Sequence, residues 1–556
     1  MNQESAVQVP ALAGVAAPAD TVTATGEAWL HRRARDVRFR DVLGMLALVA
    51  AGFVAVVRFA EWWFRAEHVG SLPLFVALSL ALWYGVARIV IGWINCAAIR
   101  HPQPRTAPPG LRVAIFTTST PGEPIEMFDR TLAACARIRY PHTTWLLDDT
   151  RDPRFAELAA RHGARHAEVL DVPGAKAGKI NRALALTDAD FILVLDPDHI
   201  PFPEFLDRVL GYFDDPRIGF VQVAQAYYNQ ERSLVARAAA EQTYAFYGPT
   251  QSGLHGHGAA VAIGANCTFR RAALASIGGH GIGLAEDLVT SIRLHAAGWR
   301  SGYVPEIVSR GLVPEDLGSF YRQQLKWARG VYEVLFAELP RLFTRLSWRQ
   351  RFAYAAIGSY YLFGITTALF LCLPYLYLWT GVQPAAMQFN GFLVAGGPVA
   401  IFGAVIYLFA QRWLCDPAAK RGLHLRGMSL KIACWPIVMA GALLAIVRAH
   451  IPYIPTEKRG VRGRFPRLAW PHLALQATFL LTLVWTLYRR LVLMDQVDVR
   501  LTSEATWGMI GFAAVPACLL ALAVRAAWQA RTPPRGGAWD ALAVTDTESR
   551  TLVNHR

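Results

Sequence analysis

One segment, Phe191-Ile192-Leu193-Val194-Leu195-Asp196-Pro197-Asp198-His199, carries most of the information about the fold. Its first five residues predict a buried strand, and the strand ends at Asp196-Pro197 because both residue types are poor strand formers. An Asp-x-Asp at a strand end projects two carboxylates into one crevice, where a divalent cation would offset their repulsion. His199 offers a further ligand. The alternative is a turn with Asp as a helix cap, which Asp-Pro sequences often form.

Short apolar runs of this kind alternate with helical stretches between residues 105 and 345. The predicted strands are Val113–Thr118, Thr144–Leu147, Ala167–Val172, Phe191–Asp196, Ile218–Gln225 and Ala260–Ala265. The predicted helices are Met127–Ile138, Arg154–His162, Ala175–Leu186, Glu231–Phe246 and Asp287–Ala297. Strand–helix alternation favours a mostly parallel α/β sheet. Ligands of such sheets bind beyond the carboxyl ends of the strands, so the functional residues are expected there.

The composition of the whole chain indicates a membrane protein. The 556 residues are 54% hydrophobic and 17% charged, with a formal charge of +15. This much apolar surface excludes a disordered or nucleic-acid-tail protein, and a basic excess beside apolar runs is typical of cytoplasmic membrane flanks. The seven cysteines contain no Cys-x-x-Cys pair, which argues against a zinc knuckle or a disulfide framework.

Seven apolar runs approach the length of about 20 residues that crosses a hydrocarbon core. They are Val42–Phe64, Leu72–Ile94, Phe352–Leu378, Phe389–Phe409, Leu430–Val447, Pro471–Tyr488 and Ala505–Trp528. Basic flanks place both chain ends on the cytoplasmic side, which requires an even number of crossings. Leu430–Val447 has basic residues on both sides, so we interpret it as an interfacial or re-entrant helix and predict six spans. Arg489 and Arg490 fall at the predicted outer end of a span, where the positive-inside rule does not expect basic residues.

Two polar motifs accompany the Asp-x-Asp. Asp148-Asp149 follows the predicted strand Thr144–Leu147, so its carboxylates reach the same edge of the sheet. The segment 174–181, Gly-Ala-Lys-Ala-Gly-Lys-Ile-Asn, opens a helix with two glycines and two lysines. A helix N-terminus with nearby lysines is a site for anionic oxygens, although lysines on a helix are more often simply solvated.

Two more motifs come later in the chain. Glu286-Asp287 begins a predicted helix, where two acids either complement the helix dipole or leave one acid as a general base. Gln323-Gln324-Leu325-Lys326-Trp327 begins a stretch that leads to the membrane. That stretch is also consistent with a plain amphipathic interfacial helix with an aromatic anchor.

In this order the motifs resemble those of the processive family-2 glycosyltransferases, specifically the bacterial cellulose-synthase-like branch. The family pattern is Asp-Asp, Asp-x-Asp, Glu-Asp and Gln-x-x-Arg-Trp, and the resemblance covers roughly residues 40–530. Ala175–Asn181 is similar to the family's His-Ala-Lys-Ala-Gly-Asn-Leu-Asn segment. Gly264-Ala265-Asn266 with Arg270-Arg271 matches its Cys-Gly-Thr-Asn…Arg-Arg segment, and Tyr453–Lys458 matches its gating loop.

The resemblance implies a GT-A-like nucleotide-sugar-binding α/β domain, inserted between α-helical transmembrane segments. It implies an inverting enzyme that polymerises a β-linked glucan from UDP-glucose and translocates the growing chain across the inner membrane. An alternative is a single addition to a lipid or oligosaccharide acceptor, and a more remote one is an inactive glycan-binding or export protein.

The resemblance also assigns roles to individual residues. The UDP-sugar contacts would be Asp148, Asp149, Lys176, Asp196, Gln323, Lys326, Thr456 and Lys458. The ligands of Mg²⁺ (or Mn²⁺) would be Asp196, Asp198 and His199. The acceptor contacts would be Trp327, Gly264 and Asn266. The catalytic pair would be Glu286 and Asp287, of which Asp287 takes the proton of the acceptor hydroxyl.

The chain departs from the family pattern at Lys326, where the family usually has Arg, and at Pro455 in the gating loop. Lysine keeps the positive charge but lacks the bidentate fork for phosphate. We expect no nucleic-acid partner, and the tail after the last span is too short for a PilZ-type cyclic-di-GMP-binding domain. The resemblance leaves room for a periplasmic accessory subunit.

The expected protein is therefore a multi-pass protein of the bacterial inner membrane, with the catalytic domain and both termini cytoplasmic. The expected division is a disordered tail 1–28, two transmembrane helices 29–104, the glycosyltransferase domain 105–345, two transmembrane helices 346–428, an interfacial helix and gating loop 429–470, two transmembrane helices 471–528 and a cytoplasmic tail 529–556.

Overall fold

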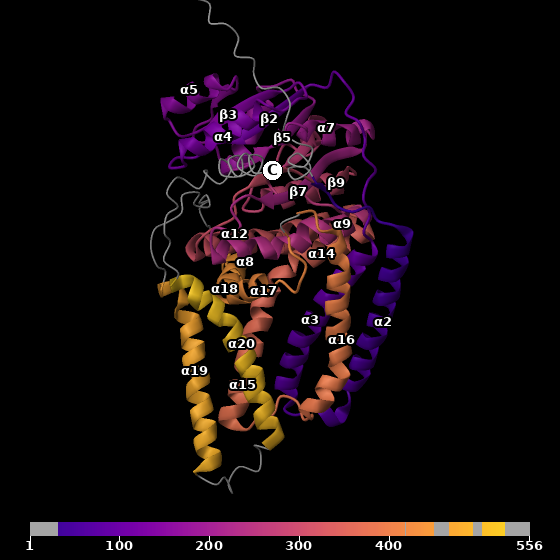
Figure 1. Ribbon diagram of the computed structural model, residues 1–556, viewed down its shortest axis with the longest axis vertical. Coiled ribbons are helices and arrows are strands. Elements are labelled where there is room, and N and C mark those ends of the chain that lie inside the picture. Colours follow the sequence, from indigo (N-terminus) through magenta and orange to yellow (C-terminus); the bar gives the residue numbers. More distant parts are fainter. Residues whose placement is uncertain (1–31, 417–418, 450–465, 493–502, 529–556) are drawn as a thin grey trace, which may run out of the picture.

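The computed structural model describes residues 32–416, 419–449, 466–492 and 503–528. Figure 1 shows an α/β part at one end and a group of long, roughly parallel helices at the other. Shorter helices lie between these two parts. Thr456 and Lys458, with the rest of the predicted gating loop, are outside the described residues.

The α/β part is built on a nine-stranded sheet. The strands are β1 (Arg32–Arg33), β2 (Val113–Thr118), β3 (Thr143–Asp148), β4 (Arg165–Glu168), β5 (Phe191–Val194), β6 (Ile200–Pro201), β7 (Ile218–Tyr227), β8 (Cys267–Arg270) and β9 (Arg300–Gly311). Their order is β1-β9-β7-β8-β5-β2-β3-β4, with β6 beside β9. The block β4-β3-β2-β5 is parallel, as is the pair β7–β9, while β8 is antiparallel to both of its neighbours. The predicted α/β fold is confirmed.

Helices cover the sheet and join it to the membrane part. They are α4 (Ile125–Cys135), α5 (Pro153–Arg161), α6 (Ala175–Leu184), α7 (Phe205–Val209), α8 (Leu234–Ala245), α9 (Gln251–Gly256), α10 (Arg271–Ser276), α11 (Glu286–Ala296), α12 (Leu317–Glu333) and α13 (Leu339–Leu342). Successive side chains of β2 enter different cores: Val113 and Ile115 one, Ala114 and Phe116 the other. Because both faces of the sheet are buried, its central strands are continuous apolar runs without polar alternation.

The strand predicted at Ala260–Ala265 is wrong. The strand lies just downstream, at β8, and the predicted segment forms no ladder. The Gln222 side chain supplies backbone hydrogen bonds that a neighbouring strand would otherwise make. It accepts from Ile263 N–H and donates to the Ala265 carbonyl. Gly264 and Asn266 have φ of +79° and +56°, and two left-handed residues so close together interrupt a strand.

The long strand β9, which lies between β7 and the two-residue strand β1, was not predicted. It contains Pro305 and Glu306 in its middle, which break the apolar pattern and remove one backbone donor. The register between β7 and β9 shifts at Val223/Ala224, and the carbonyl of Pro305 accepts instead from Ala34 N–H at 2.8 Å. A strand with such irregularities has no clear signal in one sequence.

The long helices form the membrane part. They are α2 (Phe39–Trp63), α3 (Leu72–Ala97), α14 (Trp348–Gly358) continuing as α15 (Phe363–Thr380), α16 (Phe389–Ala410), α19 (Pro466–Leu491) and α20 (Ser503–Trp528). Within the described ranges, six helical segments are long and apolar enough to cross a membrane. Large apolar side chains on them are exposed, for example Leu80 at 69% and Val394 at 78%, as a lipid-facing surface requires. The chain is a multi-pass membrane protein.

The apolar stretch Leu430–Val447 forms two helices, α17 (Leu425–Ala433) and α18 (Trp435–Ile446), bent by 45° at their junction. Both pack against helices of the α/β part, and Figure 1 shows them between that part and the spans. On α18, a Cβ added to Gly441 would lie 3.1 Å from the Cβ of Ala328 on α12. The interfacial or re-entrant interpretation of this stretch stays a prediction.

Candidate active site

Three predicted metal ligands meet where β5 ends. Ligand atoms of Asp196, Asp198 and His199 lie within 4.8 Å of one another. The Leu312 N–H donates to Asp198 Oδ2 at 3.0 Å, and this bond ties the loop after β5 to the end of β9. The apolar strand and the Asp-Pro turn thus deliver all three side chains to the crevice at the carboxyl end of the sheet.

The environment of His199 fits a metal ligand. Its side chain is 2% exposed, yet neither ring nitrogen makes a hydrogen bond. The Asp198 Oδ1 atom lies 3.6 Å from Nδ1, too far for a hydrogen bond, so both nitrogens lack the partner that buried imidazoles normally have. Space for the ring depends on Gly311, where an added Cβ would lie 2.5 Å from the imidazole. A divalent cation on two carboxylates and one imidazole satisfies this donor set.

Lys176 on α6 joins the acidic trio to the rest of the site. Its buried ammonium pairs with Asp196 and also donates to the Gly264 carbonyl. Burial alone would lower the pKa of Lys176, but the carboxylates of Asp196, Glu286 and Asp287 raise it above its ordinary value. The side chain therefore stays cationic, and its role in binding the donor stays a prediction.

Glu286 and Asp287 begin α11, directly before the core side chains Leu288 and Val289 of that helix. Burial and the neighbouring Glu286 carboxylate raise the pKa of Asp287 to about 7, although Leu288 N–H, Lys176 and Lys326 act in the other direction. A carboxyl with a pKa near the working pH can accept and release a proton, so it is a candidate general base. A Cβ added to Gly264 would lie 3.5 Å from Asp287 Oδ2, which places this carboxylate beside the Lys176 contact.

Helix α12 holds Gln323, Lys326 and Trp327, all partly buried. Lys326 lies close enough to influence Asp287 electrostatically, and Trp327 packs against the apolar cluster that includes Tyr361 of the membrane part. No described contact joins Gln323 to the acidic residues. The helix approaches the start of α11 closely because Gly330 has no side chain.

The Gly330→Ala variant tests this close approach. An added Cβ would lie 2.7 Å from the Ala285 backbone nitrogen, just before the Glu286-Asp287 pair. We expect a loss of about 1–3 kcal/mol of stability and a fall in turnover of about tenfold or more, because the acids are displaced. Thermal unfolding and turnover measure the two effects. Gly92→Ala, in a helix with open space around the glycine, should leave both close to wild type.

The structure separates the roles of Asp148 and Asp149. Asp148 is buried and accepts from Ser119 Oγ, Thr150 N–H at 3.0 Å and His166 Nε2 at 2.9 Å. Burial would raise the pKa of Asp148, but these hydrogen bonds outweigh it and hold the pKa below its ordinary value. Asp149 pairs with Lys179 at 2.6 Å.

Sequence reasoning did not assign Ser119, His166 or Lys179 to the site. The only signal available was the spacing of Lys176 and Lys179, which places both on one face of a helix. Asn266, predicted to contact the acceptor, is fully buried, and its side-chain oxygen accepts from Ser309 at 2.7 Å. This bond fixes the loop that carries Gly264, while a direct acceptor contact of Asn266 stays a prediction.

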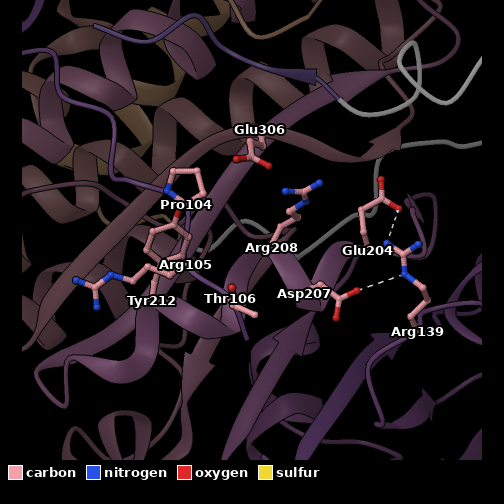
Figure 2. Close-up of a pocket in the computed structure, with 9 residues that line it drawn as sticks. All are labelled: Pro104, Arg105, Thr106, Arg139, Glu204, Asp207, Arg208, Tyr212 and Glu306. Atoms are coloured by element: carbon pink, nitrogen blue, oxygen red, sulfur yellow. Dashed lines mark hydrogen bonds and ion pairs between the residues drawn. The ribbon is translucent and has the colours of Figure 1, made fainter. Parts of the chain in front are cut away.

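Figure 2 shows a separate cavity of about 300 Å³ beside α7. The nine residues that line it are Pro104, Arg105, Thr106, Arg139, Glu204, Asp207, Arg208, Tyr212 and Glu306. The Arg139 guanidinium pairs with Asp207 at 3.4 Å and with Glu204 at 3.9 Å. None of the predicted site residues lines this cavity, so the chemistry is assigned to the acidic crevice.

The fold and the crevice define the class: a membrane protein with a GT-A-like α/β domain and an acidic site at the carboxyl ends of its strands. The model of glycosyl transferase family group 2 matches residues 191–527, more than half of the chain. The chain belongs to this family. Within it, the similarity is to cellulose synthases, as the order of the motifs predicted.

Named relatives support this placement. Putative cellulose synthase 2 of Komagataeibacter xylinus is 28% identical over 374 residues, which cover 65% of this chain and 24% of that protein. The UDP-forming cellulose synthase catalytic subunit of Pseudomonas fluorescens (strain SBW25) is 24% identical over 504 residues, 83% of this chain and 67% of that subunit. The chain thus spans only about a quarter of the length of the first of these relatives.

Among solved structures, a mannosyltransferase from Pyrobaculum calidifontis in complex with GDP-Man and Mn²⁺ is similar with a TM-score of 0.46 and 16% identity. The similarity covers 68% of this chain and 99% of that one.

Proposed function

We propose that the chain is an inverting glycosyltransferase that polymerises a β-linked glucan from UDP-glucose and moves the product across the inner membrane. The observation that carries the proposal is one continuous chain of contacts. Lys176 pairs with Asp196 of the acidic trio and donates to the Gly264 carbonyl, and Gly264 faces Asp287. A cation site and a general base therefore lie on either side of one lysine.

This arrangement supports a single displacement. Asp287 takes the proton of the acceptor hydroxyl while the hydroxyl oxygen forms a bond to the anomeric carbon of the donor sugar. The bond from that carbon to the diphosphate breaks, and UDP leaves with the electron pair. Lys176 and Lys326 stabilise the charge that develops on the diphosphate. Attack opposite the leaving group inverts the anomeric configuration.

Asp196, Asp198 and His199 would hold the divalent cation. A cation held by these residues would supply positive charge to the departing diphosphate. Two carboxylates suit Mg²⁺, whereas the imidazole favours Mn²⁺, and we propose that both support the reaction.

The position of Trp327 supports an acceptor site beside the membrane helices. Trp327, the proposed platform for the terminal acceptor sugar, packs against a cluster that contains Tyr361 of one candidate span and Val438 of α18. An acceptor that rests on Trp327 thus already lies beside the membrane helices. We propose that residues 105–345 and both chain ends are cytoplasmic, and that the partners are the donor, the growing glycan and the bilayer, with room for a periplasmic accessory subunit.

The deciding experiment is turnover of the detergent-solubilised full chain. It is offered labelled UDP-sugars one at a time, with Mg²⁺ or Mn²⁺, and the product is digested with linkage-specific glucanases. We expect a high-mass product from UDP-glucose that a β-glucanase degrades. If the product is a lipid or oligosaccharide with one added sugar, the enzyme transfers single sugars and does not polymerise. If another donor gives the high-mass product, the proposed donor UDP-glucose is wrong.

A further inference from the structure

Residues 336–351, which we call the arginine segment, lead from α12 into the candidate span that begins at Trp348. Residues 339–351 contain four arginines and no acidic side chain. One of the four, Arg351, is used inside the protein, because its guanidinium donates to backbone carbonyls of the segment at 2.8 and 2.9 Å. The other three are exposed and form no ion pair or side-chain hydrogen bond with another described residue: Arg341, Arg345 and Arg349.

Large aromatic rings are exposed on the same segment. They are Phe336 at 52%, Phe343 at 43% and Trp348 at 70%. The Arg349 guanidinium lies 5.3 Å from the centre of the Trp348 ring, so charge and ring occupy one surface. Exposed apolar rings mark a surface that has a partner, and aromatic rings beside basic side chains are typical of the headgroup level of a membrane.

The length of the span places this surface at the membrane boundary. The helical stretch Trp348–Thr380 has 33 residues. It is therefore about 50 Å long, whereas the hydrocarbon core is about 30 Å thick. Residues 352–380 contain no charged side chain, so the end that leaves the core is the one with Trp348 and Arg349. Figure 1 likewise shows α12 and α14 between the α/β part and the long helices.

The arginine segment is joined to α11, the helix that begins with the acidic pair Glu286-Asp287. The Arg293 guanidinium of α11 donates to both carboxylate oxygens of Glu338, at 3.1 and 2.8 Å. Helix α11 and the segment also share one buried apolar cluster, which contains Ile292 and Leu346. Because packed side chains transmit displacements, a shift of the segment also shifts α11.

We propose that the arginine segment binds the anionic phospholipids of the bilayer and that this contact holds α11 in its active position, the second half of which rests on the proposed function. Headgroup phosphate oxygens accept hydrogen bonds from the exposed guanidinium groups, whose planar fork matches phosphate geometry. A zwitterionic headgroup has the same phosphate, but its own ammonium offsets the charge. Three arginines without an acidic neighbour therefore select lipids with a net negative charge.

The first test maps lipid contacts on the full chain in phosphatidylcholine nanodiscs that contain a trace of a photoactivatable phospholipid. A phosphatidylglycerol probe should label peptides from residues 336–351 about fivefold more than a phosphatidylcholine probe with the same acyl chains, the effect of one arginine near an anionic surface. A triple variant of the segment should remove this difference: Arg341→Gln, Arg345→Gln and Arg349→Gln.

The matched control replaces three exposed arginines near α4 and α7, at the end of the molecule away from the long helices, and should keep the difference. Its substitutions are Arg105→Gln, Arg137→Gln and Arg208→Gln.

The second test measures turnover of UDP-glucose in phosphatidylcholine nanodiscs with and without phosphatidylglycerol. The anionic lipid should raise wild-type turnover about fivefold, a common size for coupling between two sites. The triple variant of the segment should lose this response. Glu338→Gln should keep the lipid labelling but lose most of the response, because the ion pair to Arg293 is broken. The control triple variant should respond as wild type does.

Equal labelling of the segment by the two probes overturns the lipid site and leaves an acidic protein surface as the partner of the arginines. Turnover that ignores phosphatidylglycerol while the labelling difference persists overturns the coupling to α11. If the triple variant of the segment does not fold, the wild-type map decides, because phosphatidylglycerol labels confined to other parts of the chain contradict the proposal. The expected labelling without turnover in any lipid contradicts the proposed function and not the lipid site, so the two failures are distinguishable.

Discussion

Replacement of Asp287 by Asn should lower turnover by about 10²–10⁴-fold, the usual contribution of a general base. The amide preserves the shape of the side chain and its hydrogen bond from Leu288 N–H at 2.8 Å, but it cannot take a proton. Donor binding should change little, because the acidic trio and Lys176 remain. Turnover and the Kd of UDP-glucose, measured on the same preparation, separate the two effects.

The pH dependence of wild-type turnover follows from the same residue. Burial and the Glu286 carboxylate raise the pKa of Asp287 to about 7. The base must be ionised to act, so turnover should be full above pH 8 and fall about tenfold for each pH unit below the pKa. The residual turnover of Asp287→Asn should lack this dependence. A wild-type profile that is flat between pH 5 and 8 would contradict the assignment.

The thermal stability of the Asp287→Asn protein provides an internal control. A carboxyl whose pKa is raised by folding stabilises the protein below its unfolded pKa, and this contribution is lost as the pH rises through the folded value. Removing the charge of Asp287 should therefore preserve or raise the melting temperature at pH 8 while turnover is lost. Asp171→Asn, an exposed position with φ of +52° that Asn tolerates, should change neither quantity.

The parts of the fold that could be predicted are those with a local cause. β2 and β5 are apolar runs because both of their faces are buried, and the Asp-Pro that ends the second run marks the crevice. The six candidate spans are visible as apolar length alone. The order of the motifs along the chain identified the family, and the match of the family model to residues 191–527 confirms it.

The parts that could not be predicted depend on contacts between distant segments. The sequence around Lys179 is that of a solvated lysine, and only the packing of α6 over β2 and β3 brings it to Asp149. Ala260–Ala265 has the composition of a strand, but the side chain of Gln222, from another strand, takes up its hydrogen bonds. Such effects override local propensity and leave no trace in it.

Loss of the cation should abolish turnover as completely as loss of the base. Asp198→Asn keeps the shape that accepts Leu312 N–H at 3.0 Å but removes one anionic ligand. We expect Mn²⁺ affinity to fall by more than tenfold and turnover by about 10²–10⁴-fold, because the leaving diphosphate is no longer neutralised. Electron paramagnetic resonance of Mn²⁺ measures binding independently of activity.

Chelation of wild type provides the matching test without a substitution. Turnover should disappear in excess EDTA and return with Mg²⁺ or Mn²⁺, whereas Asp198→Asn should recover only partly at raised metal concentration. Asp171→Asn should bind Mn²⁺ and turn over as wild type does. Full turnover in EDTA would mean that Lys176 and Lys326 alone neutralise the diphosphate. The buried, unbonded nitrogens of His199 argue against that outcome, because a site that works without a cation has no use for an imidazole held in this way.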